Sequence, residues 1–177
     1  MTLSKARQIS YASLGLALLI ISAQISLPIW TIAVTLQTLV VGLLATILPY
    51  RLNLMIILAY LTLGLLGLPI FANFTNGMSV LVGPTGGYLI GFLAYSTVTT
   101  IGIAWLGRKP LTLFGVTFVA SISQLLIGTV WLLFFLKLTW PVALMTGFVP
   151  YVLIELIKCG LISQIAPRLR ANLFKDS

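Results

Sequence analysis

Charged residues are scarce in this sequence. Of its 177 residues, 7% are charged and 60% are apolar, whereas soluble globular proteins carry about 25% charged residues. So little charge cannot coat the water-exposed surface of a soluble protein of this size. Apolar runs recur to the end of the chain, so a removed signal peptide does not explain the composition. The sequence therefore predicts an integral membrane protein surrounded by lipid bilayer.

Histidine, cysteine and acidic residues are also rare. The chain has no histidine, one cysteine and two acids, Glu155 and Asp176. The single Cys159 excludes an internal disulfide, and a structural zinc site would need more histidine or cysteine ligands. The acids are not paired, and no catalytic set accompanies them. We therefore predict a binding protein rather than an enzyme, with no cofactor in this chain.

Long apolar runs predict six membrane-spanning helices. A bilayer core about 30 Å thick takes about 20 helical residues to cross. The runs are continuous and longer than the alternating segments of about 10 residues in a barrel strand, so an all-α bundle is expected. There is no soluble tail or linker, so residues 1–177 should form one compact membrane domain. The predicted spans are roughly 8–29, 33–49, 54–73, 85–106, 112–136 and 142–166.

Basic residues give the chain a net charge of +8, which could suggest a nucleic-acid partner. Their positions argue against that. Basic residues fall before the first span, in alternate connections and after the last span: Lys5, Arg7, Arg51, Arg108, Lys109, Arg168, Arg170 and Lys175. Connections 26–32 and 74–84 carry no charge, and Lys137 is the exception. Basic residues prefer the cytoplasmic side, so both termini of this multi-pass protein are predicted to face the cytoplasm from the plasma membrane.

One acid and one lysine lie inside the sixth predicted span. Glu155 and Lys158 are three residues apart and share a helix face, although a charge at the centre of a membrane helix costs roughly 2.5–3.5 kcal/mol. Pro150 should break or restart this helix, with Tyr151 at the edge of the break. A structural ion pair is one interpretation. The other is a binding site, in which a small molecule offers donors to Glu155 and an acceptor or negative charge to Lys158.

The connection 67–92 reads GLPIFANFTNGMSVLVGPTGGYLIGF. Pro69 should end or kink the third helix, and MSVLV is apolar enough to fold back onto the bundle. A phosphate-loop interpretation of GPTGG fails because no lysine follows. Gly83, Gly87 and Gly91 are spaced by four, which favours close helix packing. Backbone contact with a ligand is the alternative.

Three motifs resemble those of the BioY family, the biotin-binding S components of energy-coupling factor (ECF) transporters. They are VTLQTL at 34–39, GLPIF followed by GPTGGYLIGF, and Glu155-x-x-Lys158. The likeness covers the whole chain. Many members have Pro-Gly-Asp before x-x-Lys, whereas this chain has PYVLIELIK, with glutamate for aspartate. The extra methylene moves the carboxylate outward but keeps the type of contact.

The resemblance implies high-affinity capture of biotin from outside. A transmembrane coupling subunit and cytoplasmic ATPases, which use the ATP, would then drive uptake. Glu155 suits a ureido N–H, and Lys158 suits either the ureido carbonyl or the tail carboxylate. For the neutral polar residues, the alternative to substrate contact is ordinary loop and helix-end polarity. For Tyr88, the alternative is a position at the membrane–water interface. The expected substrate-binding residues are Glu155, Lys158, Asn73, Thr75, Asn76, Gln37 and Tyr88.

The resemblance also implies that small residues of the first helix face the coupling subunit. Here these are Ala12, Ser13, Gly15 and Ala17, and Ser13-x-x-x-Ala17 has the spacing for close approach. Packing inside the bundle would favour the same residues. Three other functions remain open: an S component for another vitamin, a self-sufficient proton-coupled carrier, and a structural membrane subunit without a ligand. A proton relay usually needs several titratable groups, and Glu155 is the only acid in a predicted span.

Overall fold

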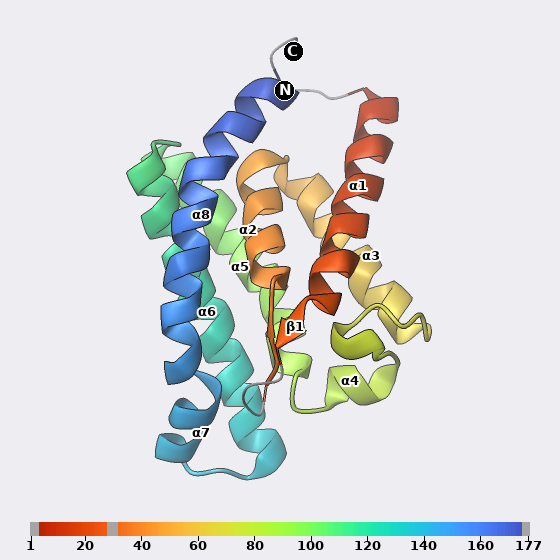
Figure 1. Ribbon diagram of the computed structural model, residues 1–177, viewed down its shortest axis with the longest axis vertical. Coiled ribbons are helices and arrows are strands. Elements are labelled where there is room, and N and C mark those ends of the chain that lie inside the picture. The colour runs from red at the N-terminus through yellow and green to blue at the C-terminus, as the bar shows by residue number, and fades with distance from the viewer. Residues whose placement is uncertain (1–3, 28–31, 175–177) are drawn as a thin grey trace.

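The computed structural model describes residues 4–27 and 32–174, and these ranges form a helical bundle (Figure 1). The predicted all-α class is confirmed, with one small two-stranded sheet added. In chain order the elements are α1 (Lys5–Gln24), β1 (Ser26–Leu27), β2 (Val34–Thr35), α2 (Gln37–Ile47), α3 (Tyr50–Leu65), the 3₁₀ helix η1 (Ala72–Phe74), α4 (Met78–Val82), α5 (Gly86–Leu106), α6 (Pro110–Leu136), α7 (Trp140–Gly147) and α8 (Val149–Leu173).

Four stretches of the described chain are long and apolar enough to cross a membrane: α1, α5, α6 and the combined α7–α8. The apolar helices α2 and α3 are shorter. With a rise of 1.5 Å per residue, α2 is about 16 Å long, roughly half the thickness of a bilayer core. The number of bilayer crossings therefore does not follow from helix length alone.

The first three helices have other ends than the sequence predicted. The first span was expected to reach residue 29 and the second to begin at 33, but Ser26 pairs with Thr35 and Leu27 with Val34 in an antiparallel ladder. This pairing ends α1 at Gln24 and delays α2 to Gln37. The third helix runs over 50–65 instead of 54–73. It ends just before Gly67, whose φ of 99° requires the left-handed backbone that glycine adopts easily.

Close packing of α5 on α6 explains two of the three spaced glycines. A Cβ at Gly87 would lie 2.2 Å from Cβ of Trp131, and one at Gly91 would lie 2.8 Å from Cγ of Gln124. The packing interpretation is therefore right for these two positions. Gly83 instead lies in the turn before α5, where a Cβ would meet the carbonyl oxygen of Ser79 at 2.5 Å.

The two ends of the bundle differ. The start of α1 and the end of α8 lie at one end, whereas α4, α7 and the two-stranded sheet lie at the other (Figure 1). At the first end, Arg108 donates to the carbonyl oxygen of Thr46, and Arg170 donates to that of Ile47 over 2.6 Å. These bonds satisfy carbonyl groups at the end of α2 that have no helical partner. Burial lowers the pKa of Arg108, and the charge of Arg170 lowers it further.

The final helical stretch is interrupted where the sequence predicted. Phe148 has φ −123° and ψ −65°, which are not helical values, and it separates α7 from α8. Pro150 lies in the first turn of α8, where the N–H that proline lacks would have no helical partner. Tyr151, Glu155 and Lys158 follow within three turns of this new start and are all buried.

Candidate binding site

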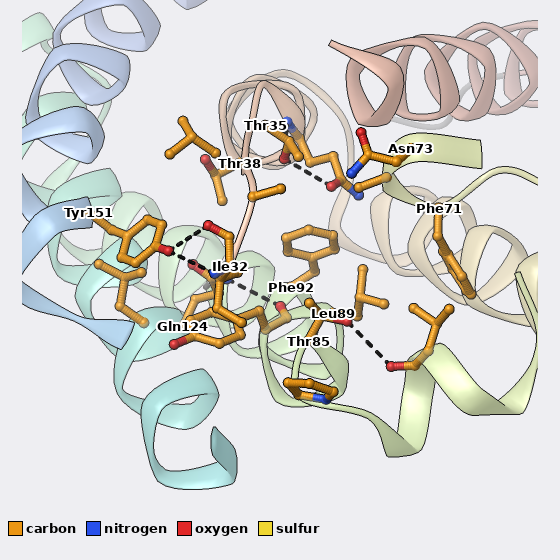
Figure 2. Close-up of a pocket in the computed structure, with 18 of the residues that line it drawn as sticks. Ile32, Thr35, Thr38, Phe71, Asn73, Thr85, Leu89, Phe92, Gln124 and Tyr151 are labelled. Carbon is orange, nitrogen blue, oxygen red and sulfur yellow. Dashed lines mark hydrogen bonds between the residues drawn. The ribbon is translucent and has the colours of Figure 1, made fainter. Parts of the chain in front are cut away.

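A cavity of about 430 Å³ lies between α2, α5, α6, α8 and the loops at the end away from the start of α1 (Figure 2). Its volume falls within the range of roughly 300–1,000 Å³ in which proteins bind small ligands. Apolar side chains of α5 and Phe71 form much of the wall. The buried polar side chains come from α2, α6 and α8, so polar groups from distant parts of the sequence converge here.

Glu155 and Lys158 form a buried ion pair in the wall of this cavity. Nζ of Lys158 lies 2.7 Å from Oε1 of Glu155. The Thr38 hydroxyl donates to the same Oε1 over 2.7 Å and accepts from Nζ of Lys158 over 2.7 Å. The exposed fractions of Thr38, Glu155 and Lys158 are only 8%, 4% and 7%. Burying two charges is costly even when they are paired, and the second carboxylate oxygen, Oε2, has no partner at all.

Gln37 connects the cavity to α3. Its side-chain oxygen accepts from the Thr35 hydroxyl over 2.9 Å, and its Nε2 donates to the Tyr60 hydroxyl over 2.8 Å. Tyr60 in turn donates to the carbonyl oxygen of Ile70 over 3.1 Å. This chain of hydrogen bonds fixes the beginning of α2 against the loop that follows α3.

The loop after α3 supplies the exposed side of the cavity. Asn73 has φ 56°, a left-handed conformation that asparagine tolerates better than most residues. Its Oδ1 accepts from the Ser26 hydroxyl over 3.0 Å. The Thr75 hydroxyl donates to the carbonyl oxygen of Ala72 over 2.8 Å. Asn73 and Thr75 both line the cavity and are solvent-exposed, so a ligand could cover them.

Tyr88 and Tyr151 use their hydroxyl groups to hold the framework together. Tyr88 donates to the carbonyl oxygen of Gly147 over 2.8 Å. Tyr151 donates to the carbonyl oxygen of Ile32 over 2.5 Å and accepts from its N–H over 3.2 Å. Both rings line the cavity and are more than nine-tenths buried. Tyr88 is thus a wall of the cavity and not an exposed interface residue.

A comparison with protein families adds a second line of evidence. The BioY family model matches residues 1–175. This chain belongs to the BioY family. It is 40% identical over 160 residues to biotin transporter BioY2 of Lactococcus lactis subsp. cremoris (strain MG1363), with 90% of this chain and 88% of the relative covered. It is 37% identical over 164 residues to biotin transporter BioY of Thermotoga maritima, with 93% and 96% covered.

A solved structure has the same fold. It is the S-component for biotin from an ECF-type ABC transporter, and it superposes with a TM-score of 0.86 at 22% sequence identity. The alignment covers 96% of this chain and 95% of that one. Because the sequence identity is low, this likeness is evidence for the architecture alone.

The structure brings together most of the residues predicted to bind substrate. Glu155, Lys158, Asn73, Thr75, Gln37 and Tyr88 all line the one cavity, whereas Asn76 is exposed and does not line it. Trp30, the tryptophan in connection 26–32, lies outside the described residues. Whether the lining residues contact substrate stays a prediction.

Sequence reasoning missed Thr35, Thr38 and Gln124 of the lining. Thr35 and Thr38 lie within the motif VTLQTL, and Gln124 is an amide inside the predicted fifth span. A polar side chain in an apolar run was the available signal for Gln124, as a charged side chain was for Glu155 and Lys158.

The small residues of α1 do not share one face. Ser13 and Ala17 are exposed and Ala12 is partly buried. Gly15 is buried, and a Cβ there would lie 2.8 Å from Cδ1 of Ile56 and 3.2 Å from Cδ2 of Leu44. Gly15 therefore packs against α3 and α2, so it is unavailable to a partner in this conformation. A coupling surface on α1 would instead combine Ser13 and Ala17 with exposed leucines.

Proposed function

We propose that this chain binds biotin from outside the cell and delivers it for uptake as the substrate-binding S component of an ECF-type transporter. One observation carries the proposal: in a member of the BioY family, a buried ion pair with an unpartnered carboxylate oxygen lines a cavity of about 430 Å³. Ionisable groups inside a membrane bundle usually mark a substrate site, because packing alone would be served better by apolar residues.

The chemistry of the cavity fits biotin. The ureido ring of biotin carries two N–H donors and a carbonyl acceptor, and the rest of the molecule is a thioether ring with a carboxylate tail. The Glu155–Lys158 pair would face the ureido ring. Phe71, Leu89 and Phe92 supply apolar wall for the thioether ring, and the tail would extend toward the exposed loop at Asn73 and Thr75.

Six crossings with both termini in the cytoplasm are part of the same proposal. The start of α1 and the end of α8 lie at one end of the bundle (Figure 1), as an even number of crossings requires. Arg108 and Arg170 lie at that end, and basic residues favour the cytoplasmic side of the plasma membrane. The cavity would then face the outside.

The partners in uptake would be a transmembrane coupling subunit and cytoplasmic ATPases that supply the ATP. The exposed surface of α1 is a candidate contact for the coupling subunit. Leu14, Leu18 and Ile21 are 58%, 45% and 58% exposed there, beside the small residues Ser13 and Ala17. Small residues allow close approach of a neighbouring membrane helix.

Uptake of radiolabelled biotin tests this function. Cells that lack their own biotin uptake would express the chain with or without an ECF module. The chain with the module should accumulate biotin, an excess of unlabelled biotin should compete, and other vitamins should not. An uncoupler at constant ATP should leave uptake unchanged. Loss of uptake with the uncoupler would favour a proton-coupled carrier, and competition by another vitamin alone would reassign the substrate.

A further inference from the structure

Gln124 is a polar residue in the middle of α6, and only 2% of it is exposed. Its Nε2 donates to the backbone carbonyl oxygen of Tyr88 over 3.2 Å. This bond fixes the orientation of the amide, because flipping it would place two acceptor oxygens against each other. Oε1 therefore points away from that carbonyl, and it has no hydrogen-bond partner. Figure 2 shows Gln124 on the same side of the cavity as Tyr151 and opposite Asn73.

Unpartnered acceptors at the cavity come from two helices. Among the described residues, five buried side-chain polar atoms have no partner, and they belong to Asn53, Tyr95, Thr99, Gln124 and Glu155. Of these residues, only Gln124 and Glu155 line the cavity. Buried polar groups in native proteins are usually paired. Two residues that line one cavity, Gln124 on α6 and Glu155 on α8, therefore each carry a buried acceptor atom without a partner, which matches a ligand with two donors.

Lys158 provides the complementary donor. An ammonium group carries three N–H donors, and in this structure Nζ donates to Glu155 and Thr38. One proton is left for a ligand acceptor. Two acceptors and one donor are complementary to a cyclic urea, in which two N–H groups flank one carbonyl. The neutral amide also matters, because a second buried carboxylate at position 124 would repel Glu155.

We propose that Gln124 determines specificity for the cyclic urea: its Oε1 accepts one ureido N–H while Oε2 of Glu155 accepts the other. The inference rests on the proposed function and adds the orientation of the substrate. The ureido ring lies between α6 and α8, the carbonyl faces Lys158, and the tail points toward the loop. Desthiobiotin, which keeps the cyclic urea but lacks the thioether, then makes the same polar contacts as biotin.

Equilibrium binding to the full chain purified in detergent tests this assignment. Gln124→Met keeps the side-chain length and removes the acceptor, so it should weaken biotin and desthiobiotin by about tenfold each. The control is Thr99→Val, which removes an unpartnered buried polar atom outside the cavity and should leave binding unchanged. Gln124→Met also removes the donor to the carbonyl oxygen of Tyr88, so this ligand-free variant should melt at a somewhat lower temperature than the parent. Binding is therefore measured well below the melting temperature of each variant.

Two biotin analogues provide a test on the unmodified protein. In each analogue one ureido N–H is replaced by oxygen, at either ring position, which gives two isomeric cyclic carbamates. Both isomers should bind the parent about tenfold more weakly than biotin. The isomer that lacks the N–H facing Gln124 should lose little further affinity in Gln124→Met, because its hydrogen bond to residue 124 is already absent.

The outcomes separate the two proposals. If the parent does not bind biotin, the proposed function fails. If the parent binds biotin but Gln124→Met binds within about twofold of it, or if one carbamate isomer binds as well as biotin, the role of Gln124 is overturned and the proposed function stands.

Discussion

At the scale of single residues, three side chains decide whether the cavity can hold a charged pair inside a membrane. Thr38 both donates to Glu155 and accepts from Lys158, so Oε1 is fully used while Oε2 is not. A purely structural pair would be expected to use both oxygens, because an unpaired buried acceptor costs about 1–3 kcal/mol. The free oxygen is therefore the feature that a ligand would complete.

Single replacements of the pair should weaken biotin binding. Hydrogen bonds to charged groups contribute about 1.5–3 kcal/mol, and about 1.4 kcal/mol corresponds to tenfold in affinity. Lys158→Met and Glu155→Gln should each reduce the affinity at least roughly tenfold in equilibrium binding. Lys158→Met should also lower the melting temperature, because it leaves a carboxylate buried without its partner.

The double replacement Glu155→Gln with Lys158→Met provides the control for stability. It removes both charges together, so it should fold with nearly the stability of the parent but should not recover biotin binding. A double variant that bound biotin as tightly as the parent would mean that the pair only supports the fold.

The sequence predicted the charged pair but not the neutral polar residues of the same cavity. A charge in an apolar run stands out, because few reasons other than function offset its cost. Thr38 and Gln124 are uncharged, and such residues occur in membrane helices both as packing contacts and as ligand contacts. Only the three-dimensional arrangement distinguishes the two, by showing which hydrogen-bonding atoms already have partners.

At the scale of secondary-structure elements, the end of α1 controls the loop over the cavity. Nε2 of Gln24 donates to the carbonyl oxygens of Ile70 and Phe71 over 3.2 and 3.1 Å, and its Oε1 accepts from the N–H of Phe74 over 2.9 Å. Phe74 and Asn73 both have φ near 57°, which costs of order 1–3 kcal/mol for each non-glycine residue. One side chain thus holds a strained loop in place.

Replacing Gln24 with leucine should free this loop. Amide exchange at 70–77 should become faster, and biotin should dissociate faster because Asn73 and Thr75 would no longer be held at the cavity. In the parent, adding biotin should slow exchange in the same segment. Hydrogen exchange with mass spectrometry measures both effects.

The matched control is Gln164→Leu, which changes an exposed glutamine of α8. It should alter neither the exchange of 70–77 nor the dissociation of biotin. Unchanged amide exchange of 70–77 in Gln24→Leu would show that the loop does not depend on the hydrogen bonds of Gln24.

Helix type was predictable from the sequence, but several helix ends were not. Continuous apolar runs predict helices because a bilayer requires the backbone to satisfy its own hydrogen bonds. The break before Pro150 was also predictable, because proline restricts the backbone locally. The ladder between 26–27 and 34–35 depends on two segments meeting in space, so no local pattern marks it, and both adjoining helices were predicted too long.

At the scale of the whole molecule, the elements place the cavity near one end and the guanidinium groups of Arg108 and Arg170 at the other. We expect this cavity to face the outside and to be filled by biotin. Accessibility of single cysteines to a membrane-impermeant thiol reagent tests both parts together in intact cells. The background is Cys159→Ser, which removes the one native thiol, itself buried.

Three cysteine positions are compared in this background. Thr75→Cys lies in the cavity lining, Thr139→Cys lies at the same end but outside the lining, and Lys5→Cys lies at the start of α1. Positions 75 and 139 should be labelled from outside, and biotin should slow labelling at 75 but not at 139. Position 5 should be labelled only after the cells are permeabilised. Labelling of position 5 in intact cells, or labelling of position 75 that saturating biotin leaves unchanged, would contradict these expectations.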